Sequence, residues 1–197
     1  AIWFDALASF ELHMDQPNAL QLYDALFEKG TDFAANLYLD DEDYSFFIQK
    51  VRGILERYAQ INPNAWVELG LQYMLCRRHV VDKEKTCFYL KKGIDAGVKI
   101  AKPLFLYYNY LGVLTQLERE TAKKELDQLA SEDELWGIAY TAHVDVWTND
   151  FETVFDRIQV LSQSQDKKLL RHYYEILQFY YARKNDKAKR VELLEEG

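Results

Sequence analysis

The feature that most constrains this chain is a pattern of two helices joined by a short turn, which recurs along it. In residues 65–97, an amphipathic stretch with Gly70 and, three positions on, Tyr73 precedes a second apolar-periodic stretch that stops at Gly97. A small residue beside large ones lets two helices pack closely, and a glycine just after a helix supplies the left-handed residue that ends it. The segment therefore predicts two helices packed against each other.

Glycine and asparagine residues recur at spacings close to one or two lengths of this unit. Gly30 and Gly97 are 67 residues apart, and Asn149 and Asn185, each followed by an aspartate, are 36 residues apart. We expect an Asn or Asp at such a junction to cap the incoming helix by accepting a backbone N–H. The spacings predict a helical repeat of about 36 residues, and such arrays are binding scaffolds more often than catalysts.

Composition agrees with an all-helical chain. Of its residues 49% are apolar, and only three prolines and eight glycines interrupt a sequence rich in Leu, Ala, Glu, Lys and Tyr. This composition favours helix over sheet. The periodicity predicts helices over residues 3–14, 17–29, 32–38, 43–60, 64–77, 82–96, 101–113, 116–129, 132–147, 150–163, 167–183 and 186–196.

One unit of the chain resembles the Sel1-like repeat, a relative of the tetratricopeptide repeat in which two antiparallel helices form a unit of about 36 residues. The matching positions are Leu69-Gly70, Tyr73, Val80-Val81, Asp82, Lys85, Tyr89, Lys91-Lys92 and Gly97. Other parts of the chain are more degenerate: Cys76-Arg77-Arg78-His79 replaces the glycines of the inter-helix loop, and Tyr107 stands where the Leu-Gly glycine belongs.

The resemblance implies a right-handed α-solenoid of about six antiparallel helical hairpins, forming a single domain over residues 1–197. Proteins with such repeats act as adaptors in secretion, signalling and host contact, and several bacterial immunity proteins that neutralise a secreted toxin look like short arrays of this kind. We therefore expect a non-catalytic, protein-binding scaffold, either an adaptor or an inhibitor. An immunity protein is the narrower alternative, and it implies the bacterial cytoplasm or periplasm.

The long apolar runs, such as Leu104 to Tyr108, fall far short of the roughly 20 residues that a membrane-spanning helix needs. We expect no membrane insertion. Cys76 and Cys87 are the only two cysteines, too few for a disulfide framework or a metal site of thiolates alone. Buried thiols are expected at both positions.

Charge is distributed unevenly along the chain. The formal net charge is −8, which argues against a general nucleic-acid binder. Residues 1–50 carry ten acids and two bases, whereas residues 166–190 carry eight bases and three acids. The acidic end predicts a basic protein or toxin as partner, with Asp40, Asp41 and Asp43 as contact residues. Ordinary solvated helix faces are the competing interpretation.

A second contact surface is expected on the first helix of each hairpin. If Leu69 and Tyr73 point into the core, the helical period turns other residues toward the inner concave wall. The partner-binding residues predicted there are Leu71, Tyr108, Thr141, Tyr173 and Leu177. The alternative is that these side chains are additional core.

The sequence gives weaker support for catalysis or for the binding of a metal or cofactor. His172 and Glu175 lie one helical turn apart, a spacing that two metal ligands can use, but no second such pair is found, and His13, His79 and His143 are isolated in the sequence. The sequence shows no phosphate-binding glycine loop and no recognisable nucleophile motif. We therefore expect no metal, no cofactor and no catalysis. A hydrolase or nucleic-acid-processing enzyme remains the alternative of a different class.

Overall fold

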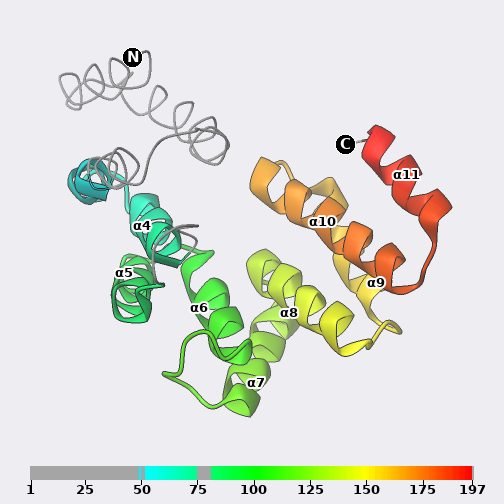
Figure 1. Ribbon diagram of the computed structural model, residues 1–197, viewed down its shortest axis with the longest axis horizontal. Helices are drawn as coiled ribbons and strands as arrows, with labels where there is room; N and C mark the ends of the chain where they lie inside the picture. Colours follow the sequence, from blue (N-terminus) through cyan, green and yellow to red (C-terminus); the bar gives the residue numbers. More distant parts are fainter. Residues whose placement is uncertain (1–48, 50–51, 75–80, 197) are drawn as a thin grey trace. The chain divides into compact units, whose positions relative to one another are not determined.

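A computed structural model describes residues 49, 52–74 and 81–196, with side chains to residue 193. The regular elements in these ranges are all helices and include no strand, which confirms the all-α prediction. The chain divides into two compact units, residues 1–96 and 97–197, and each is described by itself (Figure 1). A solenoid of six hairpins and a single domain over the whole chain stay predictions.

The expected helices over residues 3–14, 17–29 and 32–38 lie outside the described residues, as do Asp40, Asp41 and Asp43.

The described part of the first unit consists of a helical stretch over residues 52–58, α4 (Asn64–Met74) and α5 (Lys83–Asp95). Asp82 caps α5 by accepting the backbone N–H of Lys85 at 2.9 Å. Because these helices are amphipathic, their apolar faces meet in one core. It is built by Ile54, Leu55, Tyr58, Ala59, Ala65, Leu69, Tyr73 and Tyr89.

Gly70 lies at the closest approach of α4 and α5, as its place in the repeat predicted. A Cβ added to Gly70 would lie 3.0 Å from Cγ of Leu90 and 3.4 Å from the carbonyl oxygen of Thr86. Gly97 follows the end of α5 with a φ of +73°, the left-handed conformation that the sequence predicted for it.

The described part of the second unit contains five helices of ten or more residues and two short elements. They are α6 (Ala101–Tyr110), α7 (Arg119–Ser131), α8 (Leu135–Thr148), α9 (Val154–Ile158), the 3₁₀ helix η1 (Gln159–Gln163), α10 (Lys167–Arg183) and α11 (Lys187–Glu196). The bounds of α10 coincide with those predicted. Asp166 explains its start, because its carboxylate accepts the backbone N–H of Lys168 at 2.8 Å.

Helix α8 is the centre of this unit. It contacts α6, α7, α9 and α10 (Figure 1), and every residue from Trp136 to Val146 is buried. A helix that is apolar all round is one that other elements cover on all sides. Its few polar side chains, His143 and Asp145 among them, are therefore buried with it.

Asp145 is the buried carboxylate of α8, and two cations pair with it. Arg157 of α9 donates to Oδ2, and Nζ of Lys123 on α7 lies 3.4 Å from Oδ1. Burial raises the pKa of Asp145 even though both cations act to lower it. The pairs raise the pKa of Lys123, although burial acts the other way. The carboxylate is therefore costly to bury, and it ties α8 to both neighbours.

Helices α6, α7, α8 and α10 all end in the same way. The residues that follow them, Gly112, Asp133, Asn149 and Asn185, have left-handed backbones, with φ of 72°, 58°, 61° and 59°. In each case the next residue donates its N–H to the carbonyl five residues before it, at 2.8–3.1 Å. This is a Schellman ending, which needs a left-handed residue. The endings of the alternate helices α6, α8 and α10 are 37 and 36 residues apart in the sequence.

The predicted helix over residues 150–163 is wrong in its bounds and in its type. The chain turns through residues 150–153 after Asn149, the α-helical part spans only Val154–Ile158, and a 3₁₀ turn follows. Asp150 does not cap the incoming helix, because α9 begins four residues later at Val154, and its N-cap residue Thr153 makes no capping hydrogen bond through its side chain. Asp186 does cap the incoming helix, since it accepts the N–H of Lys189 at 3.1 Å.

No helix among the described residues is long and apolar enough to cross a membrane. Cys87 is a free, buried thiol, as expected, and Cys76 lies outside the described residues.

Candidate functional site

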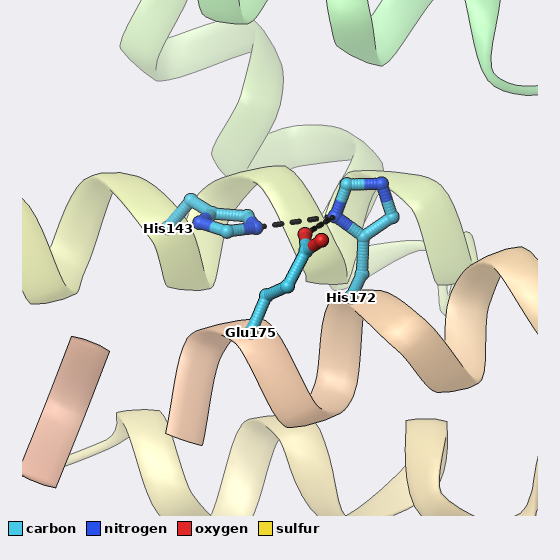
Figure 2. A group of neighbouring side chains, drawn as sticks. All are labelled: His143, His172 and Glu175. Atoms are coloured by element: carbon cyan, nitrogen blue, oxygen red, sulfur yellow. Dashed lines mark hydrogen bonds and ion pairs between the residues drawn. The ribbon is translucent and has the colours of Figure 1, made fainter. Parts of the chain in front are cut away.

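Three side chains with metal-ligating atoms converge between α8 and α10. His143 comes from α8, and His172 and Glu175 come from successive turns of α10 (Figure 2). Nε2 of His143 lies 3.2 Å from Nδ1 of His172, and the same Nδ1 lies 3.5 Å from a carboxylate oxygen of Glu175. The three ligating atoms lie within 4.8 Å of one another.

This convergence corrects the sequence interpretation of His143 as an isolated histidine. His143 and His172 are 29 residues apart, so no local spacing links them, and only the packing of α8 on α10 brings the rings together. The spacing of His172 and Glu175 did predict that these two share one face of a helix. The available signal for His143 was a polar residue inside the nearly continuous apolar run of α8.

Aromatic rings surround both imidazoles. Trp136 and Tyr140 each lie 5.4 Å from the ring of His172, measured between ring centroids. Tyr107 and Phe179 lie 6.0 and 6.4 Å from the ring of His143. Trp136 and His172 meet edge to face, as aromatic pairs prefer. These rings hold the imidazoles in a largely apolar environment.

Burial keeps both histidines neutral. Together with the neighbouring His172, it lowers the pKa of His143 to about 3. Burial also lowers the pKa of His172, although Glu175 acts to raise it. Each imidazole therefore retains a nitrogen lone pair at neutral pH, the form that binds a metal or accepts a proton.

Glu175 is the more accessible member of the cluster, with 37% of its side chain exposed. Arg171 donates to its second carboxylate oxygen, Oε1, at 3.0 Å. The hydrogen bond leaves Oε2 directed toward His172. The cluster thus has one charged and two neutral acceptor groups, a set that can take a proton or a divalent metal ion.

A surface of aromatic side chains adjoins the cluster. The aromatic surface consists of Phe151, Phe179 and Tyr180 with Trp147 and Phe155, of which Trp147, Phe155 and Phe179 are exposed. Trp147 of α8 packs against Phe179 of α10 at 6.5 Å between ring centroids, and Phe179 also contacts His143. Phe151 and Phe155 pack against Tyr180.

Cations border the aromatic surface. The guanidinium of Arg183 lies 5.1 Å from the centroid of the Trp147 ring, and the ammonium of Lys184 lies 5.0 Å from that of Tyr180. Burial raises the pKa of Tyr107 on α6, and a polar contact with Trp147 acts to lower it. Trp147 thus contacts Phe179 and Arg183 although 52% of it is exposed.

The residues predicted to line a concave groove lie mainly in the interior. Thr141, Leu177 and Tyr108 are buried, which is the alternative that the sequence left open for them, and Tyr173 is half-buried. Thr141 faces the interior because α8 is covered on all sides. Leu71 is half-buried and belongs to the first unit.

No family model, no curated protein and no solved structure matches this chain.

Proposed function

We propose that this chain is a non-catalytic scaffold of stacked helical pairs, of the Sel1-like or tetratricopeptide-like kind, that binds a protein partner through the aromatic surface of α8 to α10. The nearly equal spacing of the endings of the alternate helices α6, α8 and α10, at Gly112, Asn149 and Asn185, supports the repeat. The observation that carries the binding function is the exposed pair Trp147 and Phe179, with Arg183 stacked on the indole.

Exposed aromatics that adjoin one another are unusual on a protein that binds nothing. Trp147 and Phe179 are each about half exposed, at 52% and 49%, so a partner that covers them gains the burial of two large rings. Trp, Tyr and Arg are the residues that most often dominate the binding energy of protein interfaces. The contacts of Trp147 with Tyr107, Phe179 and Arg183 also reduce the side-chain entropy that binding would otherwise remove.

The charges around this surface define the chemistry of the partner. Arg183 and Lys184 border it, and residues 166–190 carry five more bases than acids. A segment with apolar side chains flanked by Asp or Glu complements such a surface, and the opposite charges would speed its association.

This partner differs from the one that the acidic end predicted. A basic protein or toxin held by Asp40, Asp41 and Asp43 stays a prediction, because these residues lie outside the described residues. The immunity-protein alternative depends on that end. An acidic partner on the aromatic surface favours an adaptor instead.

Capture of the partner by variants of the full chain tests the proposal. The immobilised wild-type chain, Trp147→Ala, Phe179→Ala and Phe88→Ala are exposed to the same extract of the native organism, and the bound proteins are identified and quantified. Phe88 is the matched control, since it is an aromatic residue of α5 that is 53% exposed.

We expect one protein to be retained by the wild-type chain and by Phe88→Ala, and to be lost from both other variants. Far-UV circular dichroism checks that the variants are folded. A partner that Trp147→Ala and Phe179→Ala retain as well as the wild type does would refute the proposed surface.

A further inference from the structure

In the cluster of His143, His172 and Glu175, one ring nitrogen of His172 faces two possible hydrogen-bond partners, and a single proton cannot satisfy both. Nδ1 of His172 faces both Nε2 of His143, at 3.2 Å, and a carboxylate oxygen of Glu175, at 3.5 Å. A ring nitrogen has one position in the ring plane, and it carries either a proton or a lone pair there. If the proton is present it is donated to one neighbour, and if it is absent the carboxylate faces a lone pair.

A metal cation between the three atoms resolves this conflict, and the geometry points to one: we propose that His143, His172 and Glu175 bind a divalent transition-metal ion, with Zn²⁺ as the best fit. Each residue supplies one ligating atom, as shown in Figure 2. The site joins α8 to α10 and shares no ligand with the protein-binding surface proposed above, although Phe179 of that surface contacts His143.

The distances suit a tetrahedral ion. Zinc binds histidine nitrogen at about 2.0–2.1 Å, so two ligands of a tetrahedral site lie about 3.3 Å apart. The two distances at Nδ1 of His172 are 3.2 and 3.5 Å. The third distance, from Nε2 of His143 to the carboxylate of Glu175, is within 4.8 Å. Glu175 is partly exposed, so a small rotation of its side chain brings the carboxylate to the distance that a tetrahedral ion needs.

The types of ligand select the class of metal. Two imidazoles and one carboxylate suit zinc and its neighbours in the first transition row, whereas Mg²⁺ and Ca²⁺ prefer oxygen ligands alone.

The surroundings orient the ligands. Arg171 holds Oε1 of Glu175 and leaves Oε2 toward His172, and hydrogen bonds of this kind to ligating carboxylates are usual at metal sites. Trp136 and Tyr140 pack on His172, and Tyr107 packs on His143. Both rings are therefore fixed before a metal arrives.

Isothermal titration of the metal-free full chain with ZnCl₂ tests the site, with parallel titrations of MgCl₂. The variants are His143→Gln, which removes the buried ligand, and Glu175→Gln, which removes the more exposed one. Glu175→Gln keeps the test valid if His143→Gln does not fold. The matched controls are Glu192→Gln, an exposed carboxylate of α11, and His79→Gln. His79 lies outside the described residues, near Cys76 in the sequence.

We expect one Zn²⁺ per chain, no heat with Mg²⁺, and unchanged affinity in both controls. Loss of a group that only supports a ligand weakens binding about 10–100-fold, so each ligand variant should weaken it by at least about 10-fold. With free Zn²⁺ about 100-fold above Kd, the unfolding midpoint of the wild type should rise by about 5–10 °C, and that of Glu175→Gln by much less.

Either of two results would overturn the proposal. One is the absence of stoichiometric Zn²⁺ binding to the wild-type chain. The other is an affinity that Glu175→Gln leaves unchanged while His79→Gln lowers it, which would assign the ion to the region of Cys76. Neither result would bear on partner binding, because the titration contains no partner.

Discussion

Gly137 of α8 lies directly against Leu129 of α7. A Cβ added to Gly137 would lie 2.6 Å from Cβ of Leu129 and 2.9–3.0 Å from the backbone of Leu129 and Ala130. Backbone atoms cannot move aside as the end of a side chain can, so only a glycine allows the two helices to approach this closely.

We therefore expect Gly137→Ala to destabilise the protein. Alanine favours a helix over glycine by about 1 kcal/mol, but overpacking against a backbone costs about 1–3 kcal/mol. The net loss should be up to about 2 kcal/mol in urea unfolding followed by circular dichroism.

Gly70→Ala is the matched control for this change. Its nearest neighbours are side-chain atoms of Leu90 at 3.0 and 3.1 Å, which can shift, so its cost should be close to zero. Gly70→Leu, which adds three further carbons against the buried Leu90, should cost about 1–3 kcal/mol. A larger loss for Gly70→Ala than for Gly137→Ala would contradict this account of the two crossings.

The left-handed endings of α8 and α10 predict opposite effects of alanine and glycine. Asn149 and Asn185 have φ near +60°, where most residues with a Cβ lose about 1–2 kcal/mol, Asn loses less and glycine loses nothing. Asn149→Ala and Asn185→Ala should each cost about 1 kcal/mol in thermal unfolding, and the glycine variants should be neutral or slightly stabilising. Equal midpoints for the alanine and glycine variants would show that the left-handed conformation is not required.

Some of this structure was predictable because its signals are local. Asp166 and the basic, aromatic run that follows it define α10 through a cap and a helical period. Gly97 and Gly70 mark a helix end and a helix crossing through their lack of a side chain. These features depend on residues within one or two turns of each other, and the structure confirms them.

The candidate metal site was not predictable in the same way. Half of it, His172 with Glu175, is local and was visible in the sequence. The other half needs the position of α8 along α10, and that position follows from the whole interface between the two helices. Burial of Thr141 and Leu177 has the same origin, because the helical period alone does not reveal how many neighbours cover a helix.

Asp145 is expected to contribute to stability through its two cations. Asp145→Asn leaves Lys123 and Arg157 without their buried partner, and removing one member of a buried pair costs about 3–5 kcal/mol when the other charge is fully buried. Both cations remain about a quarter exposed, so we expect a smaller loss, about 1–3 kcal/mol in urea. Asp127→Asn is the control, since this exposed partner of Lys123 should contribute less than about 1 kcal/mol. Equal stability of the two variants would argue against a role for the buried pair.

Tyr108 predicts a loss of stability at alkaline pH. Burial, with a smaller contribution from Tyr107, raises the pKa of Tyr108 to about 12. The ordinary pKa of a tyrosine is 10.0, so between pH 10 and 12 the unfolded chain releases this proton while the folded chain keeps it. Stability should fall as pH rises through this window, by about 2 kcal/mol from this group. Tyr108→Phe should show a smaller fall between pH 10 and 12, and an identical fall would contradict the assignment.

The proposed function depends on Trp147 and Phe179, and the affinity of the purified partner measures it most directly. Surface plasmon resonance compares the wild-type chain, Trp147→Ala, Phe179→Ala and Phe88→Ala at two salt concentrations. We expect the partner to dissociate at least about 10-fold faster from Trp147→Ala and Phe179→Ala than from the wild type, and at the wild-type rate from Phe88→Ala. For all four proteins, association with the partner should slow as the salt concentration rises. Dissociation rates that Trp147→Ala and Phe179→Ala leave unchanged would contradict the proposal that this aromatic surface is where the chain binds its partner.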